Sequence, residues 1–191
     1  MREQSKAAKR RFNDGYFHSR YFVGRGIDVG SGNDSLSQYI NVFHGIKSIR
    51  NWDAVDGDAQ YLDNVPDNEF DFLHSSHCLE HMVDVSLALE NWVRVVKPNG
   101  FLIITVPDFE IYEHGVWPSH YNEDHKWTFS MIQLQYKANH NIVAPKFFSG
   151  VPYTILEKVQ LITEFYNPLV FSDQTLQPNT ECCIEIILRK I

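Results

Sequence analysis

The sequence predicts an α/β fold: a doubly wound, mostly parallel sheet with helices on both faces. Three observations support this prediction. Short apolar runs alternate with amphipathic helical patterns, one run is apolar throughout, and the first run ends in two closely spaced glycines. A strand followed by a helix, repeated along the chain, implies right-handed crossovers and parallel neighbours. In such sheets a ligand binds beyond the carboxyl ends of the strands, where the strand order reverses.

The first predicted strand covers residues 25–29 (RGIDV) and ends at Gly30. Residues 33–35 (NDS) then supply several side chains that can cap a helix. A helix over residues 36–43 follows, because its apolar residues recur at helical spacing. This strand, loop and helix form the first unit of the sheet.

The second unit is less regular. Residues 46–52 (IKSIRNW) suit a strand, and a brief third element lies near residues 54–59. The sequence VPDN at residues 65–68 predicts a turn. Residues 70–76 (FDFLHSS) then indicate a central strand.

A helix and a buried strand come next. Residues 83–96 carry apolar side chains on one helical face, and Pro98 with Gly100 ends this helix sharply. Residues 101–106 (FLIITV) are apolar without interruption, which is typical of a strand covered on both faces.

Beyond this strand the pattern loosens. Residues 107–152 form a reduced region on the substrate side, with one helix expected from residue 129 to about residue 139. Two β-rich runs, residues 153–166 and 182–189, close the chain. Residues 1–23 combine basic and aromatic side chains, and we expect them either to cover the ligand as a lid or to pack on the sheet.

Size and composition favour one domain spanning residues 1–191. Of the 191 residues, 43% are apolar, which is enough to bury a core without disulfides. There is no apolar run of about 18 residues, and the charged start MREQSKAAKRRF lacks the apolar core of a secretory peptide. The three cysteines form no CxxC pair, which favours a reducing compartment. We therefore expect a soluble, cytoplasmic protein without membrane insertion.

Charge limits the classes of partner. The chain carries a formal net charge of −7, although five of its first eleven residues are basic. A broad nucleic-acid footprint would need a basic face, so we expect no nucleic-acid partner. The basic start either is a solvated segment or grips an acidic group. The sequence is compatible with a homodimer.

The stretch GIDVGSGNDSL, residues 26–36, is the clearest functional signal. Gly30 and Gly32 permit a tight turn that brings backbone N–H groups against a ligand, where a Cβ atom would obstruct. A plain turn at the end of a strand uses the same glycines. The pattern also approaches a dinucleotide fingerprint, with Asp53 about twenty residues on where a ribose-binding acid belongs. An NAD-dependent oxidoreductase is therefore one alternative.

Four motifs, in this order and spacing, favour another ligand. They are DVGSGND at residues 28–34, DGDA at 56–59, FDFLHSSHCLEH at 70–81 and VVKPNG at 95–100. Together they resemble the class I S-adenosylmethionine-dependent methyltransferases over roughly residues 24–107. The resemblance implies a Rossmann-like sheet of seven strands, the last antiparallel, and S-adenosyl-L-methionine as the cofactor.

The resemblance also implies the cofactor ligands. The matching positions are Asp28, Gly30, Ser31 and Gly32 at the methionine end, Asp53 at the ribose, Asp58 and Ala59 at the adenine, and Ser76 and His77 beside the sulfonium. The cofactor has no phosphate, so the absence of a third glycine at residues 34–35 weighs against NAD. The usual helix between the second and third strands is missing, which makes Asp56 a competing ribose ligand.

Methyl transfer from a sulfonium is an in-line displacement, so the protein must align the acceptor and exclude water. A hydroxyl acceptor also profits from a base, commonly histidine. The polar and aromatic loop that follows residues 101–106 is the expected acceptor side, because loops at strand ends carry function. The candidates are His125 or His120 as the base, His81 at a helix start, and Asp108 to orient the acceptor.

We expect no metal ion. His74, His77 and His81 have ligand-like spacing, but they straddle a strand, a loop and a helix start, so their rings need not converge. A second set, made of His114, His120 and His125 with Asp124, could form a site in principle.

The function predicted is methyl transfer to a small molecule or a glycan, with a sugar hydroxyl as the first hypothesis. The short insertions leave no separate substrate domain, and residues 124–129 (DHKWTF) loosely resemble small bacterial methyltransferases of surface-sugar synthesis. The aromatic residues that could stack on a pyranose ring are Tyr112, Trp117, Tyr121 and Trp127. The alternatives are the NAD-dependent oxidoreductase and a non-catalytic cofactor-binding module or partner subunit.

Overall fold

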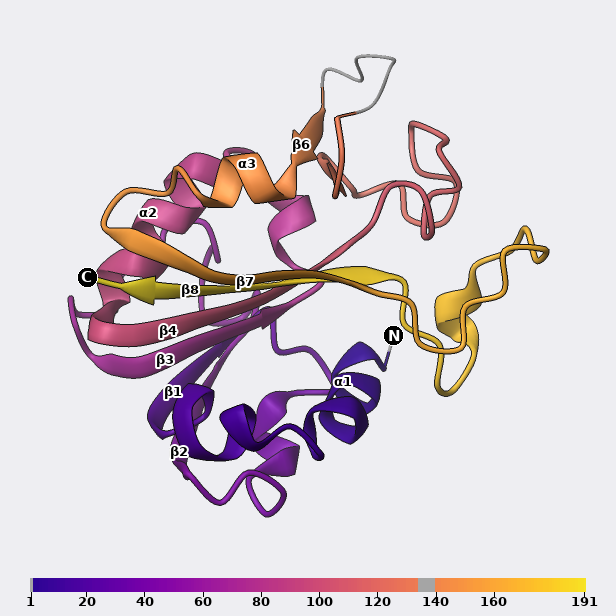
Figure 1. Ribbon diagram of the computed structural model, residues 1–191. Helices are drawn as coiled ribbons and strands as arrows, with labels where there is room; N and C mark the ends of the chain where they lie inside the picture. Colours follow the sequence, from indigo (N-terminus) through magenta and orange to yellow (C-terminus); the bar gives the residue numbers. More distant parts are fainter. Residues whose placement is uncertain (1, 134–139) are drawn as a thin grey trace.

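The computed structural model describes residues 2–133 and 140–191, and a six-stranded mixed sheet forms its centre (Figure 1). The strand order is β2-β1-β3-β4-β8-β7. The strands are β1 (Gly24–Val29), β2 (Ile46–Trp52), β3 (Phe70–Ser76), β4 (Val96–Pro107), β7 (Thr154–Ile162) and β8 (Cys183–Lys190). Strands β1 to β4 are parallel, and β8 runs antiparallel to both β4 and β7. The expected antiparallel last strand is confirmed.

The expected count of seven strands is wrong, because residues 53–69 form turns and no third strand. Aspartates hold these turns: Asp56 accepts a hydrogen bond from the backbone N–H of Asp53 at 2.9 Å. Asp58 likewise accepts from the N–H of Gln60 at 2.8 Å. Short polar side chains that satisfy nearby backbone groups favour turns over strands.

Helices cover both faces of the sheet, as predicted (Figure 1). On one face lie α2 (Val85–Val95) and α3 (Ala144–Phe148). The opposite face carries α1 (Glu3–Arg11) and a short π-helix (Phe17–Tyr21). No helix among the described residues is both long enough and apolar enough to cross a bilayer.

Two helices predicted from spacing differ in the structure. The first shortens to a 3-10 helix, Leu36–Tyr39, and the N–H of Leu36 at its start donates to Asp28 at 2.7 Å. Where the second predicted helix would begin, the chain instead forms the strand β5 (Thr128–Ser130), which pairs with β6 (Asn141–Val143). The remainder of that predicted helix, residues 134–139, lies outside the described residues.

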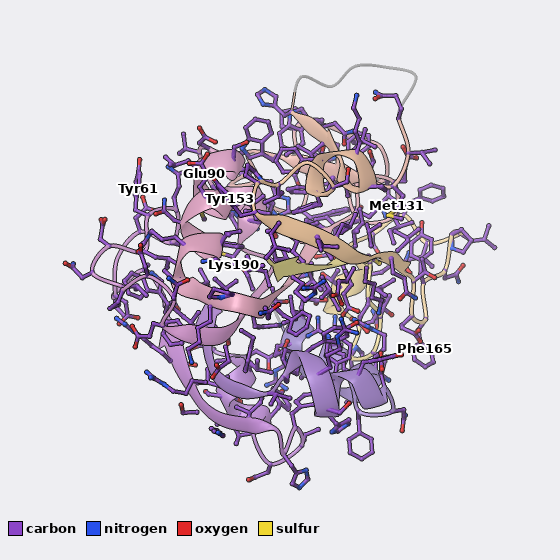
Figure 2. The ribbon with its side chains drawn as sticks, turned by 60° about the vertical axis from the view of Figure 1, so that its left-hand side comes forward. Tyr61, Glu90, Met131, Tyr153, Phe165 and Lys190 are labelled. Carbon is purple, nitrogen blue, oxygen red and sulfur yellow. The ribbon has the colours of Figure 1, made fainter. Side chains whose placement is uncertain are left out.

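The core has two parts, one on each face of the sheet. Trp92 and Leu89 of α2 pack over the middle strands, where Ile104 and Ile186 are fully buried. On the opposite face, Phe17, Phe22, Phe43 and Phe72 form a second apolar cluster. Phe17, Tyr21 and Phe22 near the N-terminus therefore pack on the sheet, whereas Phe12 and Tyr16 are exposed. Side chains fill both faces, while Tyr61 and Phe165 lie at the periphery (Figure 2).

A buried ionic cluster fastens α1 to the far end of the chain. Glu185 of β8 is fully buried and accepts hydrogen bonds from Arg10 at 3.0 Å and Arg11 at 2.8 Å. Lys158 of β7 adds a third contact to this carboxylate at 2.8 Å. Burial alone would raise the pKa of Glu185, but the three positive charges lower it well below its usual value. The basic N-terminal segment is thus largely bound to buried acids.

Candidate active site

A small polar cavity lies at the carboxyl ends of β1 and β3 and has a volume of about 300 Å³. Strand β1 pairs with β2 on one side and β3 on the other, so this is the point where the strand order reverses. Four segments line the cavity: the start of α1, the glycine loop, the end of β3 with the turn after it, and the loop that follows β4. The position agrees with the general rule for ligand sites in doubly wound sheets.

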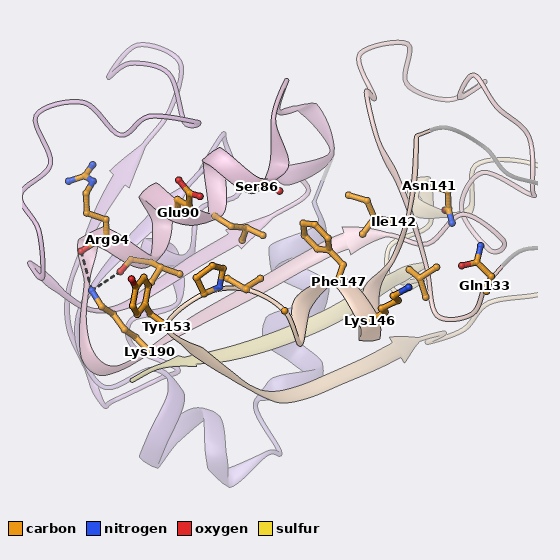
Figure 3. A pocket seen from close by; sticks show the side chains of 16 residues that line it. Ser86, Glu90, Arg94, Gln133, Asn141, Ile142, Lys146, Phe147, Tyr153 and Lys190 are labelled. Atoms are coloured by element: carbon orange, nitrogen blue, oxygen red, sulfur yellow. Dashed lines mark hydrogen bonds between the residues drawn. The ribbon is translucent and has the colours of Figure 1, made fainter.

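A larger cavity, of about 1160 Å³, lies between α2 and α3 (Figure 3). Its lining is mostly apolar, with Val93 and Phe147 on its walls and Tyr153 near one end. Lys190 lies there as well, but its ammonium donates to backbone carbonyls, including that of Val93 at 3.0 Å. No glycine-loop residue lines this cavity, so the smaller cavity is the candidate active site.

The two glycines of the loop are required for different reasons. Gly30 has a φ of +74°, and a Cβ atom there would lie 2.6 Å from the side chain of Cys78. Gly32 has a φ of +50°, and no atom lies within 4 Å of the position of its Cβ. The N–H groups of Gly30 and Ser31 donate to the carbonyl of Trp52, which ties the loop to the end of β2.

A chain of buried side chains fixes the wall below the loop. His74 lies 2.6 Å from Asp28 through Nδ1 and 3.2 Å from Arg11 through Nε2. Arginine can only donate, so Nε2 of His74 must accept and Nδ1 must donate to the carboxylate of Asp28. The other carboxylate oxygen of Asp28 accepts from the N–H of Leu36. Each carboxylate oxygen of Asp28 therefore has one hydrogen-bond partner in the protein, and Asp28 also lines the cavity.

The predicted adenosine ligands lie outside the cavity. Asp53 follows β2 and accepts from the N–H of Ala54 at 2.8 Å, so one of its oxygens caps its own turn. Asp58 is exposed, and the carbonyl of Ala59 accepts from the indole of Trp92 at 2.8 Å. None of these predicted ligands lines the cavity, which covers the methionine end of the predicted site only.

The cavity wall opposite the glycine loop holds the residues that we call the histidine cluster: Glu80, His81 and His125. One donor atom from each lies within 4.8 Å of the others. Nε2 of His125 is 4.0 Å from Oε1 of Glu80, and the two imidazole rings are 5.0 Å apart at their centroids. Glu113 contacts Nδ1 of His125 through Oε1 at 2.7 Å, so it orients this ring.

The loop after β4 is held against the turn that carries Glu80 and His81. The backbone N–H of Lys126 donates to the carbonyl of Glu80 at 2.9 Å, and its ammonium donates to the carbonyl of His81 at 2.7 Å. The indole of Trp127 donates to the carbonyl of Met82 at 2.9 Å. These contacts bring His125 to residues that are 45 positions earlier in the sequence.

Burial controls protonation in the cavity. Burial is the largest of the causes that lower the pKa of His77 to about 3, and interactions with His125, Lys6 and His81 act in the same direction. Burial also raises the pKa of Glu80 to about 8, with a smaller contribution from Glu113. His77 is therefore neutral at neutral pH, and its ring lies 3.6 Å from Glu80.

Of the predicted catalytic residues, the structure brings His81 and His125 into the cavity and leaves two outside it. His120 is exposed and does not line the cavity. Asp108 is buried beside the turn after β4, where it accepts from the N–H groups of Glu110 and Ile111. Burial raises the pKa of Asp108 to about 6. Ser76 and His77 both line the cavity, as the resemblance implied.

Sequence reasoning missed Glu3, Gln4, Glu80 and Glu113. Glu3 and Gln4 reach the cavity because α1 docks on the glycine loop, where the N–H of Ser5 donates to Asp34 at 2.9 Å. No local pattern signals a contact over 29 residues. Glu80 could have been predicted as a site residue from the sequence, because it precedes His81 in the motif at residues 70–81.

Comparisons with known proteins agree with this arrangement. Residues 27–104 match the family model described as "Methyltransferase domain". No curated protein matches the chain. The matched segment contains the glycine loop, β3 and the turn that carries Glu80 and His81.

Solved structures of low sequence identity share the fold. A SAM-dependent methyltransferase from Archaeoglobus fulgidus is 17% identical, with a TM-score of 0.58 over 100% of this chain and 95% of that one. A Burkholderia thailandensis 1,6-didemethyltoxoflavin-N1-methyltransferase, solved with S-adenosylhomocysteine, is 14% identical, with a TM-score of 0.60 over 98% and 80%. A Haloferax volcanii protein described as a methyltransferase, in complex with the Trm112 activator, is 15% identical, with a TM-score of 0.61 over 98% and 93%.

Two buried groups at the cavity fit the amino-acid end of S-adenosylmethionine. Nε2 of Gln4 and Oε2 of Glu3 have no hydrogen-bond partner among the described residues, and both residues line the cavity beside Gly32. An amide donor suits a carboxylate, and a carboxylate suits an ammonium group. The match of residues 27–104 favours a methyltransferase over the NAD-dependent oxidoreductase. These residues match the methyltransferase-domain model, and the glycine loop and the strand order agree with the fold of class I S-adenosylmethionine-dependent methyltransferases.

Proposed function

We propose that the enzyme methylates a hydroxyl group of a small, polyhydroxylated acceptor, of which a sugar is the first example. One observation carries the proposal: His125, oriented by Glu113, lines the same polar cavity as the glycine loop. A histidine held by a carboxylate on one nitrogen can accept a proton on the other. Such a pair suits an acceptor that must lose a proton.

The cofactor would lie along the glycine loop. Gly32 and Ser31 would approach its amino-acid end with their backbone, while Glu3 and Gln4 of α1 would satisfy its charged groups. Asp53 or Asp56 would reach the ribose from the end of β2, and Asp58 with Ala59 would meet the adenine, where the surface is open. When bound, S-adenosylmethionine supplies an electrophilic methyl group whose carbon–sulfur bond breaks with the electron pair left on sulfur.

The acceptor would enter between His77 and the histidine cluster. Nε2 of His125 would take the hydroxyl proton while Glu113 holds Nδ1 and stabilises the imidazolium that forms. His77, kept neutral by burial, adds no positive charge beside a positively charged sulfonium. Residues 3–4 of α1 close one wall and exclude water, which supports a lid role for the first part of residues 1–23.

The lining of the cavity supports a polar acceptor. Acidic, amide and imidazole groups from Glu3, Gln4, His77 and Asn122 face it, and no aromatic residue other than histidine is among the described lining residues. The aromatic side chains proposed to stack on a sugar lie elsewhere: Tyr112 is buried against the ring of His125, and Trp117 and Trp127 contact His140. Recognition of the acceptor would therefore rely on hydrogen bonds rather than on ring stacking.

Three buried free thiols, Cys78, Cys182 and Cys183, support a reducing compartment such as the cytoplasm.

The test combines cofactor binding with an acceptor screen. Calorimetry should give S-adenosylhomocysteine binding and no NAD binding. Methyl transfer should then be found to a sugar or sugar nucleotide, and to phenols or amines at lower rates. His125→Ala should keep the affinity for S-adenosylhomocysteine and reduce kcat by about 100-fold or more.

The matched control is His44→Ala, which removes an exposed histidine far from the cavity and should change neither quantity. Cofactor binding without transfer to any hydroxyl would contradict the proposal in favour of a non-catalytic module. Faster methyl transfer to amines than to hydroxyls would show that the acceptor is an amine and not a hydroxyl.

A further inference from the structure

We propose that the histidine cluster is a binding site for a divalent transition-metal ion, with Glu80, His81 and His125 as its ligands and a coordination position open to the cavity. The donor atoms of the three side chains lie within 4.8 Å of one another. They come from two segments that the contacts of Lys126 and Trp127 hold together. Two imidazoles and one carboxylate form a common ligand set for such ions.

The hydrogen bonds of the two rings leave the correct nitrogen available on each. Nδ1 of His125 contacts the carboxylate of Glu113 at 2.7 Å, and Nδ1 of His81 contacts the backbone carbonyl of Asp124 at 3.2 Å. Both partners accept, so each Nδ1 carries the proton and each Nε2 presents a lone pair. In metal sites the ring nitrogen that does not bind the metal usually donates its hydrogen to a carboxylate or a backbone carbonyl.

Glu80 supplies an independent observation. Its side chain is fully buried, and neither carboxylate oxygen has a hydrogen-bond partner among the described residues. An unpaired carboxylate away from water is costly. A cation between Glu80 and the two Nε2 atoms would satisfy it, and no described Lys or Arg side chain is paired with it.

The distances require only a small closure. Zinc ligands at about 2.1 Å in a tetrahedron lie roughly 3.4 Å apart. Nε2 of His125 is now 4.0 Å from Oε1 of Glu80, and the three donor atoms lie within 4.8 Å of one another. Side-chain rotations that shorten these distances by up to about 1.4 Å would therefore bring the donors into range. With three protein ligands the fourth position remains for water or substrate, as in catalytic rather than structural zinc sites.

The occupant that fits best is Zn²⁺. Imidazole nitrogen favours zinc and its neighbours over Mg²⁺ and Ca²⁺, which prefer sets made of oxygen alone. Co²⁺ accepts the same ligands and gives a visible absorption band, so it serves as a spectroscopic probe.

Binding of the ion is independent of the proposed function. Its use rests on the hydroxyl acceptor proposed there, and the ion would replace His125 as the group that makes this hydroxyl reactive. At the open position the ion would coordinate the acceptor hydroxyl and lower its pKa. Nε2 of His125 would then be a ligand, and the hydroxyl proton would pass to water at the mouth of the cavity rather than to His125. The oxygen keeps its electron pair and can attack the methyl group.

The experiment measures Zn²⁺ binding to chelator-treated protein by calorimetry and Co²⁺ binding by absorption. We expect one ion per chain. Glu80→Gln, His81→Ala and His125→Ala should each weaken binding at least 100-fold, and Glu113→Gln, which touches only a ligand, by about 10- to 100-fold. The controls His44→Ala and Glu110→Gln remove exposed groups outside the cavity and should stay within about two-fold.

Wild-type protein that takes up no stoichiometric ion, or ligand variants that bind as tightly as wild type, would overturn the site. Circular dichroism melts show whether each variant is folded. If Glu80→Gln does not fold, His81→Ala tests the site instead, because His81 is at a partly exposed position. Zn²⁺ binding without S-adenosylhomocysteine binding would support the metal site and contradict the proposed methyl-transfer function. Full methyl transfer in excess chelator, with no ion bound, would rule out a role of the ion in the reaction and leave the proposed function in place.

Discussion

At the scale of single residues, the glycine loop separates two roles that one motif usually combines. Gly30 is packed from below by Cys78, so its lack of a side chain serves the fold. Gly32 faces open space at the cavity, so its lack of a side chain serves whatever lies there. The same turn thus has one position constrained by packing and one available to a ligand.

This difference gives the first prediction. Gly30→Ala should lower the free energy of unfolding by about 2–4 kcal/mol, because a Cβ would overlap Cys78 at a positive φ. Gly32→Ala should cost about 1 kcal/mol from its φ alone but reduce the affinity for S-adenosylhomocysteine at least 10-fold. Urea unfolding and calorimetry measure the two quantities. Equal stability losses in both variants would contradict the division of roles.

At the scale of elements, the strands matched the sequence patterns and the short helices did not. Strands β2 and β3 have the bounds expected from their sequence patterns. Burial on both faces leaves β3 few alternative registers, whereas β2 lies at the sheet edge and is exposed over much of its length. The helix expected at residues 36–43 shortened to the 3-10 helix Leu36–Tyr39, whose first N–H donates to Asp28. The residues after β4 were placed by contacts with Glu80, His81 and Met82, which no local period encodes.

The docking of that loop gives the second prediction. Trp127→Phe removes the indole donor to the buried carbonyl of Met82, which should cost about 1–2 kcal/mol. It should also speed amide exchange over residues 120–127, while exchange in β3 and β4 stays unchanged. Hydrogen–deuterium exchange measures this directly.

Trp117→Phe is the matched control, because Trp117 lies in the same loop and its described contact is a ring contact with His140. Exchange that accelerates equally in both variants would show that the Trp127 hydrogen bond does not hold the loop.

At the scale of the whole molecule, the two ends of the chain meet at Glu185. Its contacts with Arg10 and Arg11 span 174 or more residues and hold α1 beside the cavity. The sequence revealed the glycine loop and the family motifs, because these are local. It could not reveal that Glu3 and Gln4 line the site, because their position depends on this distant pairing.

The buried cluster gives the third prediction. Glu185→Gln leaves Arg11 buried without its counter-charge and should cost about 3–5 kcal/mol. The pKa of Glu185 is lower in the folded chain than its usual 4.5, so its contribution is present above pH 4.5 and is lost as the pH falls further. Between pH 5 and pH 2, urea unfolding should therefore show a shallower loss in the variant than in wild type. Parallel profiles would exclude this role.

The contacts of α1 with Glu185 also determine when α1 can dock during synthesis of the chain. The first helix is synthesised well before its partners in β8. Lys6 is also held by the carbonyls of Thr175 and Thr180. Helix α1 can therefore dock, and the polar cavity can gain that wall, only after β8 has been made.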